Sequence, residues 1–201
     1  MIRETDHLIR NLFSDFKFID GDILIGSCHD EIKDELSHVV KHMYKVKESK
    51  LHWLRSLDTD VVGSGNKRYF IPNSILSDIS LCYYIVELGH YYLSKKFPDK
   101  KFSVRILPEG NNVLHMDMWM NFYERGNATS QHSHLGNLSG IIFCSTNEVS
   151  LPTTFENGVN LYGNFGDICL FPSTLGHQNG IYMGDDDRIT ISFNIEVKKC
   201  D

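Results

Sequence analysis

The sequence predicts an α+β fold that is mainly β, a jelly roll with supporting N-terminal helices. Apolar residues recur at helical spacing through the first hundred residues and alternate at strand spacing after them. The strand-like runs are short and separated by turns that contain Gly, Asn or Asp, as in antiparallel sandwiches and barrels. No repeat or linker divides the 201 residues. We therefore expect one domain over 1–201, with mostly helical support in 1–100 and the jelly-roll core in 101–198.

The helical half contains two candidate helices. Residues 30–43 carry apolar side chains at helical spacing, and residues 73–74 could cap a second helix with apolar residues between 75 and 88. Pro98 must end any continuation of this second helix, because proline lacks the N–H that a helix interior needs. A short strand is predicted at residues 22–25, ahead of the first helix.

The second half contains six candidate strands. Each is a short apolar or alternating run that ends near a turn residue, the pattern expected of strands with one face buried. The polar segment 146–157 between two of them is a candidate lid or a plain hairpin loop. The candidate strands cover 102–107, 114–123, 139–144, 159–162, 167–171 and 188–197.

Composition is that of an ordinary globular protein, with 41% hydrophobic and 23% charged residues. The net charge of -6 and the pI of about 5.9 disfavour a nucleic-acid or anionic-membrane partner. The N-terminus lacks the apolar core of a secretory signal, and no apolar stretch reaches the roughly 18 residues of a membrane span. The five cysteines form no C-x-x-C pair, which favours free thiols in a reducing cytoplasm.

Three histidines form a candidate metal site. His132 and His134 are two residues apart, so in an extended strand their side chains project from the same face. His177 follows an apolar run, and a jelly roll can bring these segments to one mouth. Imidazoles bind iron, zinc, copper or nickel. Because the chain has ten histidines, a chance H-x-H is not rare, and the prediction depends on the order and spacing of the whole set.

Arg188 and Thr190 alternate onto one face of the last predicted strand. A guanidinium and a hydroxyl side by side form a good receptor for a carboxylate, since arginine can bind both oxygens at once. The alternative is a surface salt bridge between Arg188 and the acidic residues 185–187. Three protein ligands would leave metal positions open for a substrate and oxygen, as non-haem Fe(II) oxygenases require.

Eight blocks of the second half occur in this order: Trp119 to Tyr123, Gly126, His132-Ser133-His134, Leu138-Ser139-Gly140, Gly166-Asp167, Leu170-Phe171-Pro172-Ser173, His177 and Arg188 to Asn194. Together they resemble the 2-oxoglutarate/Fe(II)-dependent oxygenase family of bacteria and phages. That family carries a W-x-N-x-Y strand, an H-x-H followed by S-G, an L-F-P-S segment and an R-x-S-x-S-F-N ending. The resemblance covers about residues 115–196, and the first hundred residues contribute nothing to it.

This resemblance implies a double-stranded β-helix with Fe(II) at its mouth. It also implies 2-oxoglutarate as co-substrate, O2 as oxidant, and hydroxylation of a substrate with release of succinate and CO2. The protein would supply positioning and water exclusion, while iron and the oxo acid supply the reactivity. The implied site residues are the metal ligands His132, His134 and His177 and the co-substrate contacts Arg188, Thr190 and Asn121.

The sequence departs from the family at His134, which stands where a carboxylate is usual. Three interpretations are open. The favoured one is an all-histidine triad; the second is a triad completed from elsewhere in the chain. In the third, His134 is the first ligand and Gly136 marks a vacant position, as in halogenating relatives. An all-histidine site would be one charge unit more positive than the usual triad, which should alter metal affinity and redox potential.

Two other functions compete with this prediction. One is a three-histidine cupin-type dioxygenase that does not use 2-oxoglutarate and has no need of Arg188. The other is a non-catalytic jelly-roll binding protein that binds metal weakly. The predicted substrate is a small molecule, an amino acid or a peptide, and the oligomeric state is open, a homodimer included. The expected location is the cytoplasm of a bacterium or of a phage-infected host cell.

Overall fold

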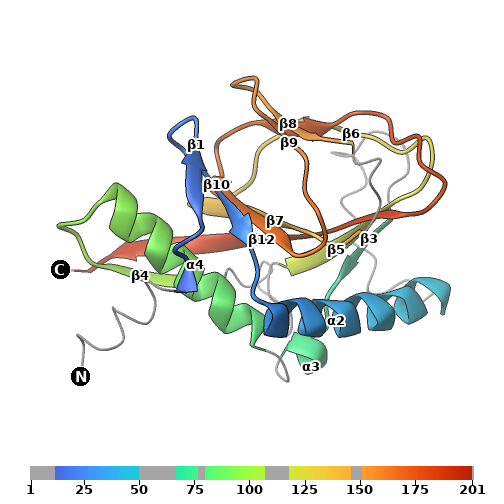
Figure 1. Ribbon diagram of the computed structural model, residues 1–201, viewed down its shortest axis with the longest axis horizontal. Coiled ribbons are helices and arrows are strands. Elements are labelled where there is room, and N and C mark those ends of the chain that lie inside the picture. The colour runs from blue at the N-terminus through green and yellow to red at the C-terminus, as the bar shows by residue number, and fades with distance from the viewer. Residues whose placement is uncertain (1–11, 50–66, 77–79, 107–117, 146–150, 201) are drawn as a thin grey trace.

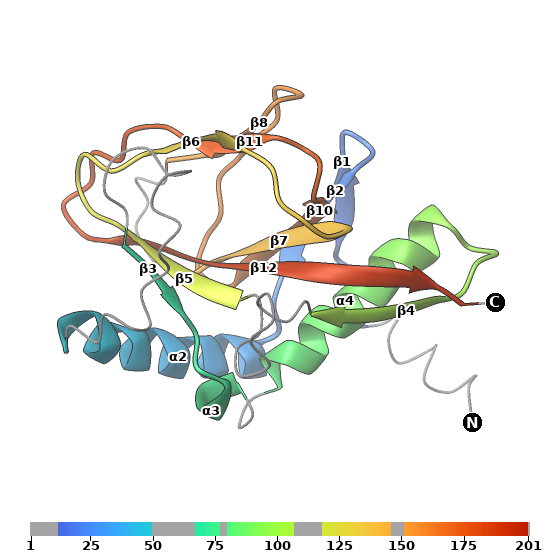
Figure 2. The same ribbon diagram turned by 180° about the vertical axis from the view of Figure 1, so that it is seen from behind.

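The chain folds as a double-stranded β-helix with helices packed against one side (Figure 1). A computed structural model describes residues 12–49, 67–76, 80–106, 118–145 and 151–200. In these residues, two antiparallel sheets face each other, and the helices cover the outer face of the larger sheet (Figures 1 and 2). The fold class predicted from the sequence is thereby confirmed.

The larger sheet is built around its longest strand, β12 (Arg188–Lys199). This strand pairs with β5 and β7 along its first half and with β4 along its second. The sheet order is β1-β2-β10-β7-β12-β5-β3, with β4 beside β12. The other strands are β1 (Lys17–Ile19), β2 (Ile23–Ser27), β3 (Lys67–Phe70), β4 (Phe102–Ile106), β5 (Met118–Tyr123), β7 (Leu138–Phe143) and β10 (Asp167–Pro172).

The smaller sheet lies over the inner face of the larger one. Its order is β6-β11-β8-β9, and all of its pairings are antiparallel. The two views agree that it forms a separate layer on the side away from the helices (Figures 1 and 2). Its strands are β6 (Thr129–His132), β8 (Thr153–Phe155), β9 (Asn160–Leu161) and β11 (His177–Asn179).

The helices are α2 (Asp30–Glu48), α3 (Asn73–Leu76) and α4 (Leu81–Lys96). Helix α2 buries five apolar residues spaced three or four apart, which places them on one side of the helix. Helix α4 approaches β4 closely at Gly89, where an added Cβ would lie 2.8 Å from Cγ1 of Val104. None of the helices in the described ranges is long and apolar enough to cross a membrane.

Strand alternation gives the larger sheet two chemically different faces. On β5, Met118, Met120 and Phe122 belong to the core shared with the helices. Trp119, Asn121 and Tyr123 alternate with them and line a cavity between the sheets. The same alternation on β12 sends its isoleucines toward the helices and Arg188, Thr190 and Ser192 into the cavity. The face toward the helices is therefore part of the apolar core, and the face toward the cavity carries polar side chains.

The second helix does not begin where the sequence predicted. A short helix, α3, ends at Leu76, and α4 begins only at Leu81. The backbone N–H of Ser80 donates to both carboxylate oxygens of Glu35 on α2, at 3.0 and 2.9 Å. A tertiary contact with α2 therefore caps α4, and no local sequence pattern could show it. The first helix begins as predicted and runs on to Glu48.

The predicted strands exist within a few residues of their expected ends, although residues 107 and 114–117 lie outside the described part. The predicted strands do not include β1, β3, β6, β8 and β11, which have three or four residues each. Within the candidate lid or hairpin loop 146–157, residues 153–155 form β8, which pairs with both β11 and β9. Residues 146–150 of that segment lie outside the described residues.

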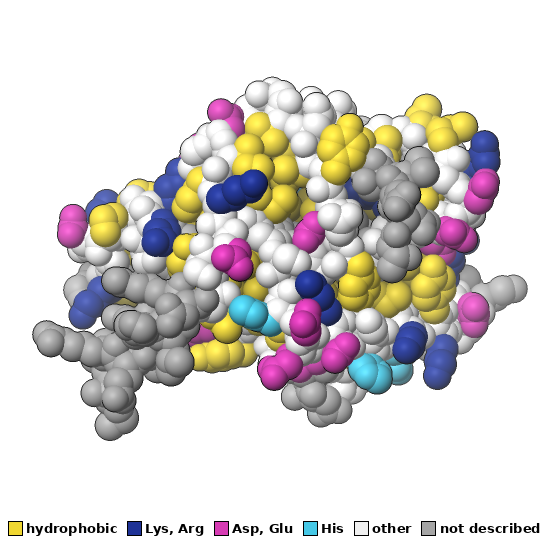
Figure 3. Space-filling model, in the orientation of Figure 1, with side chains coloured by type: hydrophobic (Ala, Val, Ile, Leu, Met, Phe, Trp, Pro, Cys, Tyr) yellow, Lys and Arg dark blue, Asp and Glu magenta, His cyan; other side chains and the backbone are white. Residues whose placement is uncertain are grey.

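Charged side chains of both signs are interspersed with apolar ones where described residues are visible in Figure 3. The apolar face of the larger sheet is buried against the helices and is not part of this surface. Of the ten buried polar or charged side chains of the described residues, seven line the cavity between the two sheets, whereas Ser139, Ser173 and Asn194 do not. The candidate functional site therefore lies in this cavity.

Candidate metal centre

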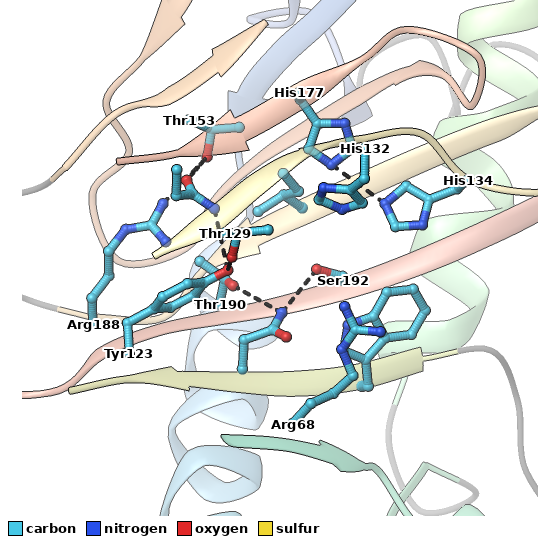
Figure 4. Close-up of a pocket in the computed structure, with 14 residues that line it drawn as sticks. Arg68, Tyr123, Thr129, His132, His134, Thr153, His177, Arg188, Thr190 and Ser192 are labelled. Carbon is cyan, nitrogen blue, oxygen red and sulfur yellow. Dashed lines mark hydrogen bonds between the residues drawn. The ribbon is translucent and has the colours of Figure 1, made fainter. Parts of the chain in front are cut away.

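His132, His134 and His177 meet at one end of this cavity (Figure 4). His132 is the last residue of β6 and His177 the first of β11, and the two are direct cross-strand partners. His134 lies two residues beyond β6, where its N–H donates to the carbonyl of Ser173 at 2.9 Å. The three possible ligand atoms all lie within 4.8 Å of one another. The fold thus gathers all three predicted histidines.

Backbone carbonyls orient two of the imidazoles. Nδ1 of His132 donates to the carbonyl of Ser130 at 2.9 Å, and Nδ1 of His177 to that of Leu175 at 3.2 Å. These bonds leave the Nε2 lone pairs available for a metal. The Nε2 atoms of His134 and His177 are 3.3 Å apart. Two nitrogens bound to one metal would lie about 3 Å apart, so the spacing suits a shared ion.

Burial keeps the three imidazoles uncharged at neutral pH. It is the largest cause that lowers the pKa of His134 to about 3, followed by the neighbouring His177 and His132. Burial and His132 lower the pKa of His177 to about 4, and burial also lowers the pKa of His132. Because metals bind neutral imidazole, these groups need lose no proton at neutral pH to become ligands.

Arg188 lies at the far end of the cavity and is only 2% exposed. Its guanidinium carbon is 5.0 Å from the ring centroid of Tyr123, and its Nη2 donates to Oγ1 of Thr153 at 3.2 Å. Its Nη1 is buried and has no hydrogen-bond partner within the described residues. Burial lowers the pKa of Arg188, although the nearby tyrosines raise it. A buried cation with an unused donor is a site for an anion.

The acidic residues before Arg188 do not neutralise it. Asp187 binds Nζ of Lys47 on α2 at 2.6 Å, and Asp185 binds Arg125 at 2.7 Å. The cavity lining contains no Asp or Glu among the described residues. The alternative of a surface salt bridge is therefore wrong for Arg188. The Lys47–Asp187 pair instead holds the start of β12 against the helical layer.

A directed chain of hydrogen bonds surrounds the guanidinium. Arginine only donates, so Thr153 accepts a hydrogen bond from Arg188, and its own hydroxyl donates to Oδ1 of Asn179 at 3.0 Å. Nδ2 of Asn179 donates to the hydroxyl of Tyr123 at 3.2 Å, and that hydroxyl lies 2.9 Å from Oγ1 of Thr129. The chain fixes each side chain, while Nη1 of Arg188 has no hydrogen-bond partner within the described residues.

Asn121 and Thr190 line the same cavity as Arg188 and the histidines. Nδ2 of Asn121 donates to Oγ1 of Thr190 at 3.2 Å and to Oγ of Ser192 at 3.0 Å. Oδ1 of Asn121 is buried without a partner in the described part of the chain. Both residues therefore lie on the inner face that strand alternation predicted, and a hydrogen bond joins their side chains.

Sequence reasoning missed part of this lining. Asn179 lies two residues after His177 on β11, so strand alternation from the histidine could have found it. Thr153 and Arg68 come from short strands in segments without a motif, and no sequence signal marked them. Arg68 stacks its guanidinium 4.8 Å from the ring centroid of Trp119.

The described residues contain one group of three or more ligating side chains that could share a metal, and it is His132, His134 and His177. No carboxylate from the described residues joins them in the cavity lining. Gly136 lies beyond this group in a turn, with a φ of 106°. The all-histidine set is thus the one that the described residues can supply.

The fold and site place the chain among proteins with a double-stranded β-helix whose mouth can hold a metal. No family model matches the sequence, and no curated protein matches it either. Solved structures do match.

A prolyl-4-hydroxylase from Pseudomonas putida matches with a TM-score of 0.56 at 9% identity, covering 93% of this chain and 97% of that one. A 2OG-Fe(II) oxygenase family oxidoreductase from Burkholderia pseudomallei matches at 0.55 and 7% identity, covering 94% and 89%. A Trichoplax adhaerens prolyl hydroxylase, solved with a peptide fragment of hypoxia inducible factor, matches at 0.56 and 12% identity, covering 100% and 92%. At such identities the similarity concerns the fold.

Proposed function

We propose that this chain is an Fe(II)- and 2-oxoglutarate-dependent oxygenase that hydroxylates a small-molecule, amino-acid or peptide substrate. The observation that carries the proposal is Arg188, a buried cation with an unused Nη1 at the end of a cavity whose other end holds three histidines. A ligand with a carboxylate at one end and metal-binding oxygens at the other would join these two features.

The histidine set fits iron. Its imidazoles are kept neutral by burial, and the 3.3 Å between Nε2 of His134 and of His177 suits two bonds to one ion. His132, His134 and His177 would hold Fe(II), which with 2-oxoglutarate and O2 supplies the oxidation of a C–H bond and yields succinate and CO2. The coordination positions that three protein ligands leave open are those that such chemistry needs.

The other residues bind and orient the co-substrate. Arg188 would donate from Nη1 to the far carboxylate of 2-oxoglutarate, which would satisfy its buried charge. Thr190 would offer its hydroxyl to the same carboxylate, while Asn121 would present Oδ1 or Nδ2 along the chain of the oxo acid. Thr153 holds the guanidinium in place, so the receptor is organised before the ligand arrives.

The solved structures support this function through their own descriptions. Two are prolyl hydroxylases and one belongs to the 2OG-Fe(II) oxygenase family. The all-histidine set favours one alternative, a three-histidine dioxygenase that does not use an oxo acid. The two functions differ in their need for Arg188, because that alternative gives a buried guanidinium no ligand.

An anaerobic calorimetric titration of 2-oxoglutarate tests the proposal. We expect binding to Mn(II)-loaded protein, much weaker binding without the metal, and loss of binding in Arg188→Ala. The control is Arg105→Ala, which removes an exposed arginine of β4 and should leave binding unchanged. Metal-dependent binding that survives Arg188→Ala would contradict the assigned receptor. Absence of binding in the wild type would leave the three-histidine dioxygenase.

A further inference from the structure

Trp119 brings an unused hydrogen-bond donor to the metal end of the cavity. The side chain lines the cavity and is 4% exposed, and its ring centroid lies 5.7 Å from that of His134. Its Nε1 is buried and has no hydrogen-bond partner within the described residues. A buried indole N–H normally has a partner, so this donor indicates that a ligand atom completes the site.

The indole ring of Trp119 is held in place by its neighbours. The guanidinium carbon of Arg68 lies over the ring, 4.8 Å from its centroid, and His134 packs beside it. Because the ring is also buried, the direction of its N–H is set before a ligand arrives. A donor that is already ordered loses little conformational entropy on binding.

Ser192 supplies a second donor beside Trp119. The two residues are direct cross-strand partners in β12 and β5, and both line the cavity. Such partners have Cβ atoms about 5 Å apart. Oγ of Ser192 accepts from Nδ2 of Asn121 at 3.0 Å, which leaves the proton of this hydroxyl for an acceptor in the cavity. Figure 4 shows Ser192 on the side of the histidines and Arg188 on the opposite side.

The two donors lie beyond the reach of a co-substrate bound at Arg188. Three cross-strand pairs of β5 and β12 line the cavity in rows. These rows are Tyr123 with Arg188, Asn121 with Thr190, and Trp119 with Ser192. The third row is four residues along β12 from the first, a distance of about 13 Å. A five-carbon oxo acid, with bonds of about 1.5 Å, is about 5 Å long, so the third row is left for another ligand.

The chemistry of the two donors suits an oxygen atom with two lone pairs. Both donors are uncharged, and a carbonyl or carboxylate oxygen can accept from both at once. Paired neutral donors of this kind fix the position of the oxygen that they bind. The described residues that line the cavity include no Asp or Glu, so no carboxylate among them competes for these donors.

We propose that Trp119 and Ser192 bind a carbonyl-type oxygen, of an amide or a carboxylate, in the substrate to be oxidised, a proposal that rests on the function proposed above. The pair would hold this oxygen beside His134 and so place a neighbouring C–H bond near the metal. A molecule without such an oxygen would leave both donors unpaired, which disfavours its binding.

The test uses protein loaded with Zn(II) and 2-oxoglutarate without oxygen, because Zn(II) has no redox chemistry. Wild type, Trp119→Phe and Ser192→Ala are first titrated with 2-oxoglutarate, and all three should bind it alike. The loaded proteins are then titrated with three series that share their side chains: L-amino-acid amides, free L-amino acids, and the corresponding amines without a carbonyl. Ser103→Ala is the matched control, because it removes an exposed hydroxyl of β4 outside the cavity.

We expect at least one amide or amino acid to bind the wild type, and the corresponding amine to bind much more weakly. Trp119→Phe and Ser192→Ala should each bind that compound about three- to tenfold more weakly, the effect of one lost hydrogen bond. Ser103→Ala should match the wild type. The series that responds distinguishes an amide carbonyl from a carboxylate.

The indole N–H signal of Trp119 reports the hydrogen bond itself. The chain has two tryptophans, so a proton–nitrogen correlation spectrum of isotope-labelled protein contains two indole signals, and Trp119→Phe identifies one of them. We expect this signal to move downfield when the compound binds, because its proton then donates to an oxygen. A signal that stays in place while the compound binds contradicts the role of Trp119.

The remaining outcomes separate this inference from the proposed function. Equal binding by the wild type and either folded variant, or no binding of any compound by the loaded wild type, overturns the inference. If either folded variant loses 2-oxoglutarate while the wild type binds it, the pair belongs to the co-substrate site and the substrate assignment is wrong. If the wild type does not bind 2-oxoglutarate, the proposed function fails and the inference fails with it. Circular dichroism identifies a variant that does not fold, and the other variant then decides the outcome.

Discussion

The imidazoles of His132 and His177 face each other across the β6–β11 pair with their ring centroids 4.4 Å apart. His132 ends its strand and His177 begins the partner strand, so the pairing of two short strands sets the geometry of the candidate metal centre. His134 joins them from the segment just beyond β6, where the carbonyl of Ser173 holds its backbone. The site thus depends on strand register more than on any single loop.

Metal binding should depend on all three histidines, and a carboxylate should be accepted at position 134. We expect one Mn(II) per chain in the wild type. His177→Ala should bind Mn(II) about tenfold or more weakly, because even the loss of a residue that only supports a metal ligand has an effect of this size. His134→Asp should retain the metal because it supplies an oxygen ligand and lowers the site charge by one unit. Calorimetry with Mn(II) measures both, with His38→Ala, an exposed residue of α2, as the control. Full binding by His134→Ala would exclude that residue as a ligand.

The metal-free chain should lose stability in acid. Burial lowers the folded pKa values of His134 to about 3 and of His177 to about 4, from 6.5 for a free imidazole. Between these values the unfolded chain binds more protons than the folded chain, so stability is complete above pH 6.5 and falls as the pH decreases toward 4. Thermal unfolding at several pH values should show this decline in the wild type, and a smaller one in His134→Gln/His177→Gln. An identical decline in the double variant would contradict the stated cause.

Thr153 should matter for co-substrate affinity although it need not touch the ligand. It accepts from Nη2 of Arg188 and donates to Asn179, so Thr153→Val would leave buried polar groups unpaired and free the guanidinium to move. We expect 2-oxoglutarate to bind about tenfold more weakly. The control is Thr154→Val on the same strand, whose hydroxyl bonds to Asn160 away from the cavity. Equal effects of the two variants would show that Thr153 acts only through general stability.

The core behind the site should not tolerate a methyl group at Gly140. Gly140 of β7 pairs with Phe193 of β12, and an added Cβ would lie 2.1 Å from Cζ of that ring. Gly140→Ala should therefore destabilise the chain by about 1–3 kcal/mol, the usual cost of overpacking. Gly180→Ala is the control, since its Cβ would meet Leu151 at an ordinary 3.5 Å. Urea unfolding compares the two; equal stabilities would mean that Phe193 moves freely.

Much of the fold and the metal site could be predicted from the sequence because alternation on long strands is a strong signal. The spacing on β12 placed Arg188 and Thr190 on one face, and the H-x-H pattern placed two histidines together. The position of His177 opposite His132 depends on a pairing between strands far apart in sequence. Periodicity gives no information about such a partner, and the resemblance to a family supplied it.

What the sequence missed lies mainly in short strands and tertiary contacts. Arg68 and Thr153 come from β3 and β8, which are too short for a clear period. The start of α4 is set by Glu35 of another helix. The hairpin of β1 and β2, by contrast, has a local signal in Asp20-Gly21, where both residues have positive φ.

The most direct test of the central claim is a crystal structure of the chain with Mn(II) and 2-oxoglutarate, prepared without oxygen. The account predicts the metal on Nε2 of His132, His134 and His177, and the far carboxylate of the oxo acid at Nη1 of Arg188. A metal held by other residues, or an oxo acid whose carboxylate lies away from Arg188, would contradict it.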